Sequence, residues 1–380
     1  MTFDTTALRR TEFPWMDDGS TVYMNAASTG PLPTRSVDAQ VEMTRRRSAP
    51  HLVTFEDQFG TLARCRALVS TMINAEPEEI GLATNTGSGI NLAAWGFPLG
   101  PGDEVVVPDC EFPANMYPWL AAARARGFSL HVVPLRDGVL DQVALLNAVA
   151  RPGVRAVSVS WVGFSNGSVA DLERIGAQCR MRDILFVVDG IQGLGALTID
   201  VKRTPVDVFA CGAQKWLLGP WGAGFTYVRR AVLERITPQP VSWMAVRGSD
   251  DFSRLVDYDL AWRDDARRFE QITLAYQDFA GMAASLDLLR ELGVAAVSAH
   301  IVSCTGQLLA RAREMGIQLV STVENHAGIA SIRPSDAPAS SERLTNAGVI
   351  HSLREGTIRL APHCYTTAED IDRTIAALRS

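Results

Sequence analysis

The sequence predicts an α/β protein in which a large domain holds a mostly parallel seven-stranded sheet and a small C-terminal domain is α+β. Two observations predict this class. Between about residues 79 and 229, apolar runs of strand length alternate with amphipathic segments of helix length, a pattern typical of a parallel sheet covered by helices. After about residue 275, a long helical stretch precedes a second, shorter α+β pattern. The length of 380 residues leaves room for two or three structural units.

Seven apolar segments are expected to build the sheet of the large domain. They are Glu79–Thr84, Asp103–Pro108, Ser129–Leu135, Ala156–Val162, Ile184–Asp189, Val206–Gly212 and Gly222–Val228. Helices are expected between them, near residues 88–96, 114–126, 141–150 and 170–182.

The C-terminal pattern begins with two helical segments, 275–292 and 294–315. Strands are expected at Gln318–Thr322, Gly328–Arg333 and Thr357–Leu360, with a closing helix over Ala368–Leu378. We therefore assign residues 20–255 to the large domain and residues 256–380 to the small one, and expect residues 1–19 to pack on the latter. The polar, irregular stretch 238–272 is interpreted as loops that could cross to another subunit.

Composition excludes several classes of protein. With 47% hydrophobic and 21% charged residues the chain is not disordered, and its apolar runs are far shorter than the roughly 20 residues that span a bilayer. No apolar signal core is visible near the start, so we expect a cytoplasmic protein without a membrane partner. A net charge of −6 argues against nucleic acid as a partner. The six cysteines form no CxxC pair and the six histidines no HxxxH pair, so no metal site is predicted.

Lysine is rare in this chain, and one of its lysines stands in an unusual place. Of the 36 basic residues only Lys202 and Lys215 are lysines. Lys215 lies in the apolar, glycine-rich run CGAQKWLLGPWG, where desolvation would lower the pKa of its amine and make it a nucleophile toward a carbonyl. The alternative is a structural lysine whose amine reaches solvent at a strand end.

A carboxylate is expected near that lysine. Asp189 ends the apolar strand that begins at Ile184, and ligands of open α/β sheets bind at the carboxyl ends of strands. The alternative is an acid that caps a turn or a helix. A nucleophilic lysine together with a buried carboxylate is what pyridoxal 5′-phosphate (PLP) requires, because a protonated pyridine ring accepts the charge of a substrate carbanion.

The two runs that carry these residues, VVDGIQGLGALTIDV and DVFACGAQKWLLGPWGAGFTYV, resemble the aminotransferase class V family of fold-type I PLP enzymes. This family includes cysteine desulfurases, isopenicillin N epimerase-like proteins and kynureninase. The resemblance extends from about residue 22 to 379 and implies the fold of a fold-type I PLP-dependent transferase. It also implies that Lys215 forms a Schiff base with the cofactor, that Asp189 pairs with the pyridine nitrogen, and that Gln192 donates a hydrogen bond to the ring hydroxyl oxygen.

The phosphate of the cofactor needs its own site. The apolar strand at 80–84 is followed by Asn85-Thr86-Gly87-Ser88-Gly89 and a predicted helix, and amides at a helix N-terminus bind phosphate well. By resemblance, this run is the phosphate loop, with Thr86 and Gly87 as its residues.

Other positions gain a role only through the resemblance. Phe112 is expected to stack on the cofactor ring, and Gln214 to contact the cofactor. Arg359 is expected to clamp the substrate α-carboxylate with two hydrogen bonds. Asn25 and Ala27, from the run YMNAASTG, are expected to line the substrate pocket. Thr273 is expected to touch the phosphate of a neighbouring subunit, which implies a homodimer with shared active sites.

The chain also departs from the family pattern. Many relatives have a serine three residues before the lysine and a histidine just before it, where this chain has Gly212 and Gln214. We expect the Gly212 amide to replace the missing hydroxyl at the phosphate. Cysteine desulfurases use a mobile cysteine ahead of the substrate arginine, and the run NAGVIHSLREGT at 346–357 has none, so persulfide formation on a cysteine is not expected.

We therefore predict a PLP-dependent enzyme that removes the α-proton of an amino acid, with Lys215 as the base. An aminotransferase is the favoured activity, and a carbon–sulfur lyase or an epimerase is the alternative. A third interpretation, from another class, is a PLP-fold protein that binds a ligand without turnover. An NAD-dependent dehydrogenase is disfavoured because no GxGxxG run follows a first strand.

Overall fold

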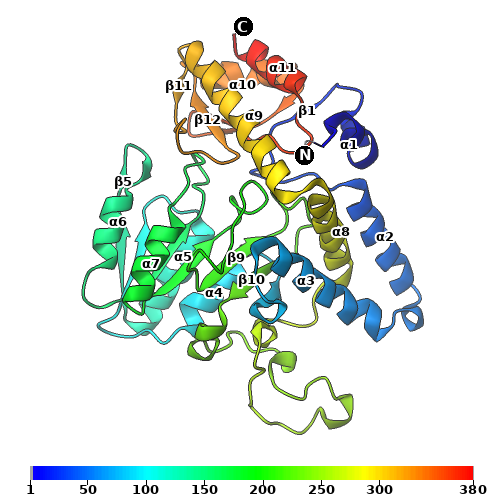
Figure 1. The fold of residues 1–380 in the computed structure, drawn as a ribbon, viewed down its shortest axis with the longest axis vertical. Helices are drawn as coiled ribbons and strands as arrows, with labels where there is room; N and C mark the ends of the chain where they lie inside the picture. Colours follow the sequence, from blue (N-terminus) through cyan, green and yellow to red (C-terminus); the bar gives the residue numbers. More distant parts are fainter. Residues whose placement is uncertain (1–2, 380) are drawn as a thin grey trace.

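A seven-stranded sheet forms the centre of the large domain in the computed structural model, which describes residues 3–379 (Figure 1). Its strands are β2 (Ile80–Ala83), β3 (Glu104–Pro108), β4 (Ser129–Val133), β7 (Val154–Ser160), β8 (Leu185–Asp189), β9 (Val208–Gly212) and β10 (Gly224–Val228). They lie in the order β2-β10-β9-β8-β7-β3-β4; β10 is antiparallel to both β2 and β9, and the other neighbouring pairs are parallel. The predicted mostly parallel sheet of the large domain is confirmed.

Alternate residues of the strands enter two different cores, one on each face of the sheet. On β8, Phe186 and Val188 pack into one core and Leu185 and Val187 into the other. A strand that is buried on both faces reads as a continuous apolar run, which is why this segment was visible in the sequence. The helices that cover one face are α4 (Thr86–Gly96) and α5 (Pro113–Arg126). Those on the other face are α3 (Thr61–Ile73), α6 (Gln142–Val149), α7 (Leu172–Met181) and α8 (Tyr276–Leu292).

Helix α8 lies after residue 256 but packs with the large domain. The Ser36 hydroxyl of α2 (Thr34–Arg47) donates to the Gly281 carbonyl at 2.9 Å, and Arg64 of α3 forms an ion pair with Asp287. Helix α9 (Val294–Glu314) then carries the chain into the small domain. The expected division between residues 255 and 256 stays a prediction. In the structure α8, which follows this division, contacts helices α2 and α3 of the large domain. Within residues 3–379 no single helix is long and apolar enough to cross a membrane; α8 and α9 reach that length and composition only as a pair, bent by 82°.

The small domain is built on a four-stranded antiparallel sheet of order β11-β12-β15-β14. Its elements, besides α9, are β11 (Gln318–Leu319), β12 (Ala330–Arg333), α10 (Ala337–Asn346), β13 (Val349–Ile350), β14 (Ser352–Arg354), β15 (Thr357–Leu360) and α11 (Ala368–Arg379). Its core also takes in Val22 and Met24 from the start of the chain, because β1 (Val22–Tyr23) pairs with β13.

The first helix, α1 (Thr5–Glu12), lies against the small domain (Figure 1). The Arg9 guanidinium donates to the Tyr365 carbonyl at 2.7 Å and forms a buried ion pair with Asp370, at the start of α11. These contacts tie the two ends of the chain together beside the small domain.

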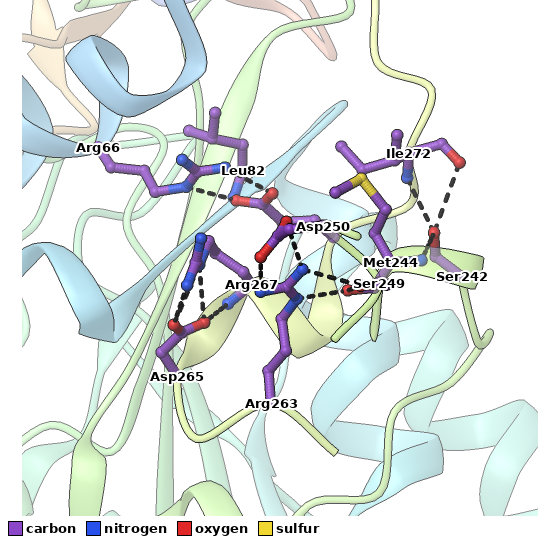
Figure 2. A network of polar contacts seen from close by, with 11 residues as sticks. Arg66, Leu82, Ser242, Met244, Ser249, Asp250, Arg263, Asp265, Arg267 and Ile272 are labelled. Atoms are coloured by element: carbon purple, nitrogen blue, oxygen red, sulfur yellow. Dashed lines mark hydrogen bonds and ion pairs between the residues drawn. The ribbon is translucent and has the colours of Figure 1, made fainter. Parts of the chain in front are cut away.

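The irregular segment 238–272 projects from the large domain (Figure 1). Ion pairs and hydrogen bonds fix its course (Figure 2). Arg263 holds both carboxylate oxygens of Asp250, at 2.9 and 2.7 Å, and also donates to the Ser249 hydroxyl at 2.8 Å. At the end of the segment, Glu270 accepts from Arg66 of α3 at 2.7 Å and from the amide of Leu82 in β2 at 2.9 Å. The segment therefore has a defined course although it holds no long helix or strand.

Two details of the large domain differ from the sequence prediction. The strand expected over Ser129–Leu135 ends at Val133, because Pro134 has no amide to donate to the ladder, and a small hairpin of β5 (Leu135–Arg136) and β6 (Val139–Leu140) follows. Four of the helices that the structure describes were also not predicted: α1, α2 and α3, and in the small domain α10.

Candidate active site

A cleft opens where the carboxyl ends of β8 and β9 face the small domain. It brings together nine of the residues predicted from the sequence. These are Ala27, Thr86, Gly87, Phe112, Asp189, Gln192, Gln214, Lys215 and Arg359. The cleft is also lined by Ser28, Asn85, Ala114, Phe164, Ile191 and Arg354, which the sequence analysis did not assign to the site.

Asp189 and Lys215 provide the two opposite charges at the base of the cleft. Asp189 is the last residue of β8 and is only 2% exposed, and burial raises the pKa of its carboxyl to about 6 although the Ile191 amide donates to it at 3.0 Å. Lys215 follows β9 by three residues. Burial lowers the pKa of its amine to about 8, against the opposing effect of the Asp189 charge. Near physiological pH a fraction of this amine is therefore neutral, whereas an ordinary lysine is almost wholly protonated.

The loop of Lys215 is held by the segment that contains Ala27. The Gly30 amide donates to the Gln214 carbonyl at 2.8 Å, and a Cβ on Gly30 would lie 2.0 Å from the Lys215 carbonyl oxygen. Only glycine allows the two segments to approach so closely. This contact explains why a run of small residues near the start of the chain borders the cleft.

Aromatic side chains form the wall opposite the lysine. The Lys215 amine lies 5.5 Å from the centroid of the Phe112 ring, and Phe112 packs edge-on against Phe164 at 5.4 Å. Phe112 is the N-cap residue of α5 and has an extended backbone, and its side chain lines the cleft. A flat ring at this place can cover one side of a planar cofactor.

The N-terminus of α4 points into the cleft. The Asn85 side chain caps the helix by accepting from the Ser88 amide at 3.0 Å, and Thr86 and Gly87 are its first two residues. First-turn amides have no partner within a helix and favour an anion. Helix α4 can lie this close to the sheet because Gly89 has no side chain. A Cβ at this position would lie 2.5 Å from the Thr226 hydroxyl of β10.

The end of β9 differs from the sequence expectation. The Gly212 amide, which we expected to replace a phosphate hydroxyl, donates to the Thr86 hydroxyl at 2.9 Å. A Cβ on Gly212 would lie 2.3 Å from Oε1 of Gln214, and this oxygen is buried without a hydrogen-bond partner. The absence of a side chain at position 212 thus makes room for the amide of Gln214, and it is Gln214 that offers an unsatisfied polar group to the cleft.

Arg359 of β15 forms the small-domain wall. Its Nη1 donates to the Phe164 carbonyl at 2.8 Å and its Nη2 to the Ser28 hydroxyl at 2.7 Å, whereas its Nε is buried without a partner. Within residues 3–379 no carboxylate forms an ion pair with it. Burial lowers the pKa of the guanidinium to about 10, and the charge of Arg354 lowers it further.

Arg354 is the main residue that the sequence analysis missed. It lies opposite Thr357 in the hairpin β14–β15, and Arg359 lies opposite Ser352. Since residues two apart share a face of a strand, Arg354 and Arg359 lie on the same face of this hairpin. The signal was present in the sequence as the run SLREGT directly before the Arg359 strand, but it depends on recognising a tight turn there.

Two predicted residues do not line the cleft. Asn25 accepts from the hydroxyl of Ser352, the cross-strand partner of Arg359, at 2.8 Å, and is not among the residues that line the cleft. Thr273 is exposed, and its neighbours Gln271 and Leu274 border a different pocket together with Thr84 and Ser88. The expected roles of both residues stay predictions.

The donor set fits PLP. A buried carboxylate can face a protonated pyridine nitrogen, an amine of lowered pKa can bind an aldehyde, and a helix N-terminus can hold a phosphate. The unpartnered Arg359 Nε and Gln214 Oε1 leave polar capacity for ligands in the same cleft.

The comparison with family models agrees with this geometry. Residues 22–374 match the model for "Aminotransferase class-V". The chain belongs to the class-V aminotransferase family. Its cofactor is pyridoxal phosphate, which a similar solved structure carries.

Relatives in this family have several activities. A probable cysteine desulfurase of Methanothermobacter thermautotrophicus is 31% identical over 95% of this chain and 94% of its own length. The protein YcbU of Bacillus subtilis, described as an uncharacterized aminotransferase, is 30% identical over 80% of this chain and 79% of its own. Isopenicillin N epimerase of Streptomyces clavuligerus is 27% identical over 95% of both chains.

Among solved structures, the cystine C–S lyase C-DES in complex with its product cysteine persulfide superposes with a TM-score of 0.87. It is 25% identical and covers 97% of this chain and 99% of its own. A C-DES variant with glycine covalently linked to PLP gives a TM-score of 0.88, with 25% identity over 98% and 99% of the two chains. These similarities confirm the fold-type I architecture predicted from the sequence.

Proposed function

We propose that this class-V enzyme is a carbon–sulfur lyase that acts on an amino acid carrying a second acidic group, such as cystine. One observation carries the proposal. Among the residues of the range 3–379 that line the cleft, three are cationic, Lys215, Arg354 and Arg359, and none is a cysteine or a histidine. The cleft thus offers one base and two anion sites, and no nucleophilic thiol. The cystine C–S lyase among the similar structures supports the same choice.

The residues divide the reaction among them. The two outer nitrogens of Arg359 face the Phe164 carbonyl and the Ser28 hydroxyl, so its guanidinium is fixed where a substrate α-carboxylate can be held. Lys215, with its lowered pKa, accepts the α-proton. When bound, PLP supplies an electron sink for the charge that this proton leaves behind. Asp189 keeps the pyridine nitrogen protonated.

Elimination needs no further acid or base from the cleft. The Cβ–S bond of cystine breaks and its electron pair stays on sulfur. The leaving group is cysteine persulfide. Water then releases pyruvate and ammonia from the remaining three-carbon unit. The second carboxylate of cystine would pair with Arg354, whose position on the same face as Arg359 suits a substrate with two acidic ends.

Attack by a cysteine of the enzyme has little support. Cys364 follows the Arg359 strand but is fully buried, and burial raises the pKa of its thiol. Cys110 is exposed but lines a separate pocket on the far side of Phe164. A thiol with a raised pKa is a poor nucleophile.

Transamination is the second candidate, and it was the activity favoured from the sequence. Transamination requires a group that carries a proton from the α-carbon to the cofactor. Among the described residues that line the cleft, only Lys215 can do this. The similarity to YcbU supports this candidate. The two activities differ in their products, because transamination needs an amino acceptor and releases no ammonia.

The deciding experiment is a product assay on the PLP-loaded enzyme with L-cystine. Elimination predicts equal amounts of pyruvate, ammonia and persulfide sulfur without any added keto acid. Turnover only after addition of a keto acid, with no ammonia, would overturn the lyase and establish an aminotransferase.

The role of Arg354 predicts a change of substrate preference. Arg354→Gln should lower kcat/KM for L-cystine by about three- to ten-fold, the effect of a partly exposed charge pair, but should leave elimination from a monocarboxylic β-substituted alanine within two-fold. Arg333→Gln, an exposed arginine of the same sheet, is the matched control. Equal losses on both substrates would remove Arg354 from recognition.

We also propose a homodimer. The projecting segment exposes large apolar side chains that a monomer in water would leave uncovered. These are Val241, Trp243, Phe252, Leu255, Val256, Tyr258 and Leu260. Sedimentation of the wild-type protein should give twice the chain mass, and the pair Val256→Asp and Leu260→Asp should shift it to the monomer. A wild-type protein that sediments as a monomer would contradict the dimer.

A further inference from the structure

We propose that Trp216, the residue after Lys215, is a positioning residue that fixes the amide of Gln192 so that its free N–H faces the cofactor. Trp216 does not line the cleft, so its side chain is not expected to contact the cofactor or the substrate. It acts through Gln192, which does line the cleft. The proposal depends on the PLP site and not on the choice between elimination and transamination.

The direction of the Gln192 amide is set by two contacts. A glutamine side chain can point its oxygen or its NH2 group to either side, and only the partners decide. Here the indole Nε1 of Trp216 lies 2.8 Å from Gln192 Oε1, and the Ala27 carbonyl lies 2.9 Å from Gln192 Nε2. An indole N–H can only donate and a carbonyl can only accept, so both contacts demand the same orientation.

This orientation leaves one N–H of Gln192 without a partner within residues 3–379. One hydrogen of Nε2 is used by Ala27, and the other remains for a ligand in the cleft. The oxygen, which would repel an electron-rich ring oxygen, is turned to Trp216. A hydrogen bond received at Oε1 also polarises the amide and strengthens the donor at Nε2. The pair thus gives Gln192 the role of donor that the family resemblance implies.

The Trp216 side chain itself has little freedom to move. Its ring is fully buried and stacks on the His363 imidazole at 5.7 Å and 22°, and His363 Nε2 lies 3.0 Å from the Trp216 carbonyl. A Cβ on Gly328 would lie 2.2 Å from the indole ring, and a Cβ on Gly195 2.3 Å from the Trp216 carbonyl. The surrounding chain is therefore shaped to hold this indole in one place.

Trp119 provides a matched control. It is also fully buried, in α5, but its indole Nε1 has no hydrogen-bond partner. Trp119→Phe and Trp216→Phe remove the same group of atoms from a packed interior, but only Trp216→Phe removes a donor that orients Gln192.

The test compares cofactor binding and the absorption spectrum of the bound cofactor at fixed pH. Trp216→Phe should raise the dissociation constant for PLP by about three- to ten-fold, the effect of losing one ordered hydrogen bond, and should change the ratio of the cofactor's two absorption bands. Trp119→Phe should leave both within two-fold of the wild type. An unchanged spectrum in Trp216→Phe, or the same change in both variants, would overturn the proposal.

A double-mutant cycle separates positioning from packing. Gln192→Leu alone should change the cofactor spectrum, and adding Trp216→Phe to it should change the spectrum no further, because the tryptophan acts through the glutamine. Additive changes would contradict this. If Trp216→Phe does not fold, Gln192→Leu still carries the test: one tryptophan indole N–H should shift in the 15N spectrum and exchange faster with solvent. No shift of any indole N–H would overturn the proposal.

Discussion

The two walls of the cleft are built on different principles. On the large-domain wall most polar groups have partners within the chain: Asp189 accepts from Ile191, Gln192 bridges Trp216 and Ala27, and Thr86 accepts from Gly212, whereas Gln214 Oε1 has none within residues 3–379. On the small-domain wall, among the residues that the structure describes, Arg354 and Arg359 face the cleft with no carboxylate in an ion pair with either. The cofactor wall is thus preformed, whereas the substrate wall carries charge that a ligand must pair.

The difference has an energetic meaning. A buried guanidinium without an anionic partner is costly, because the interior does not replace the water it has lost. A substrate carboxylate that pairs with Arg359 recovers part of this cost. Substitutions on the substrate wall should therefore weaken binding of the amino acid and leave cofactor binding unchanged. Substitutions on the cofactor wall should weaken the binding of both.

The largest expected effect is at Lys215. Lys215→Ala removes both the amine that binds the cofactor covalently and the base that takes the α-proton, so turnover should fall by at least about 1000-fold. Borohydride should fix no cofactor on the variant, as read by mass spectrometry. Lys202→Ala is the control, because this second lysine is exposed and pairs with Glu76. Cofactor fixed in Lys215→Ala at another lysine would contradict the assignment.

The next effect is at Arg359 and separates the two walls. Arg359→Gln should lower kcat/KM for the amino acid by about 10- to 100-fold, since hydrogen bonds to charged groups contribute about 1.5–3 kcal/mol. The PLP dissociation constant should stay within two-fold of the wild type. A parallel loss of PLP affinity would show that the walls are not independent.

The smallest effect concerns the pH at which apoenzyme takes up PLP. The amine reacts only when neutral, so the rate of uptake should rise with pH, with a midpoint near the Lys215 pKa of about 8. The Asp189 charge raises that pKa, so Asp189→Asn should move the midpoint to lower pH and speed uptake at pH 7, even though turnover is lost. Stopped-flow absorbance measures both, with the exposed Asp183→Asn as control. A midpoint that moves to higher pH would contradict the assigned coupling.

Much of the fold and of the cofactor wall was readable from the sequence. Buried parallel strands such as β8 are continuous apolar runs, and Asp189 and Lys215 lie within short local motifs. Helices α2 and α3 were missed because arginines and other polar residues interrupt their apolar faces, which become clear only when α8 packs between them.

The substrate wall was less predictable, because it depends on tertiary contacts. Arg354 reaches the cleft through a tight turn and the register of a hairpin, and Phe164 through a loop whose carbonyl meets Arg359. Likewise the partnership of Gly212 with Thr86 and Gln214 cannot be read from a run of letters. The sequence marked both positions as departures from the family, and the structure shows that they are coupled.

The most direct measurement is the structure of PLP-loaded Lys215→Ala soaked with L-cystine, in which removal of the base prevents turnover. We expect one carboxylate of the substrate to lie against the Arg359 guanidinium and the other near Arg354. A substrate whose carboxylates leave both arginines unpaired would contradict the division of the cleft into a preformed cofactor wall and an unpaired substrate wall.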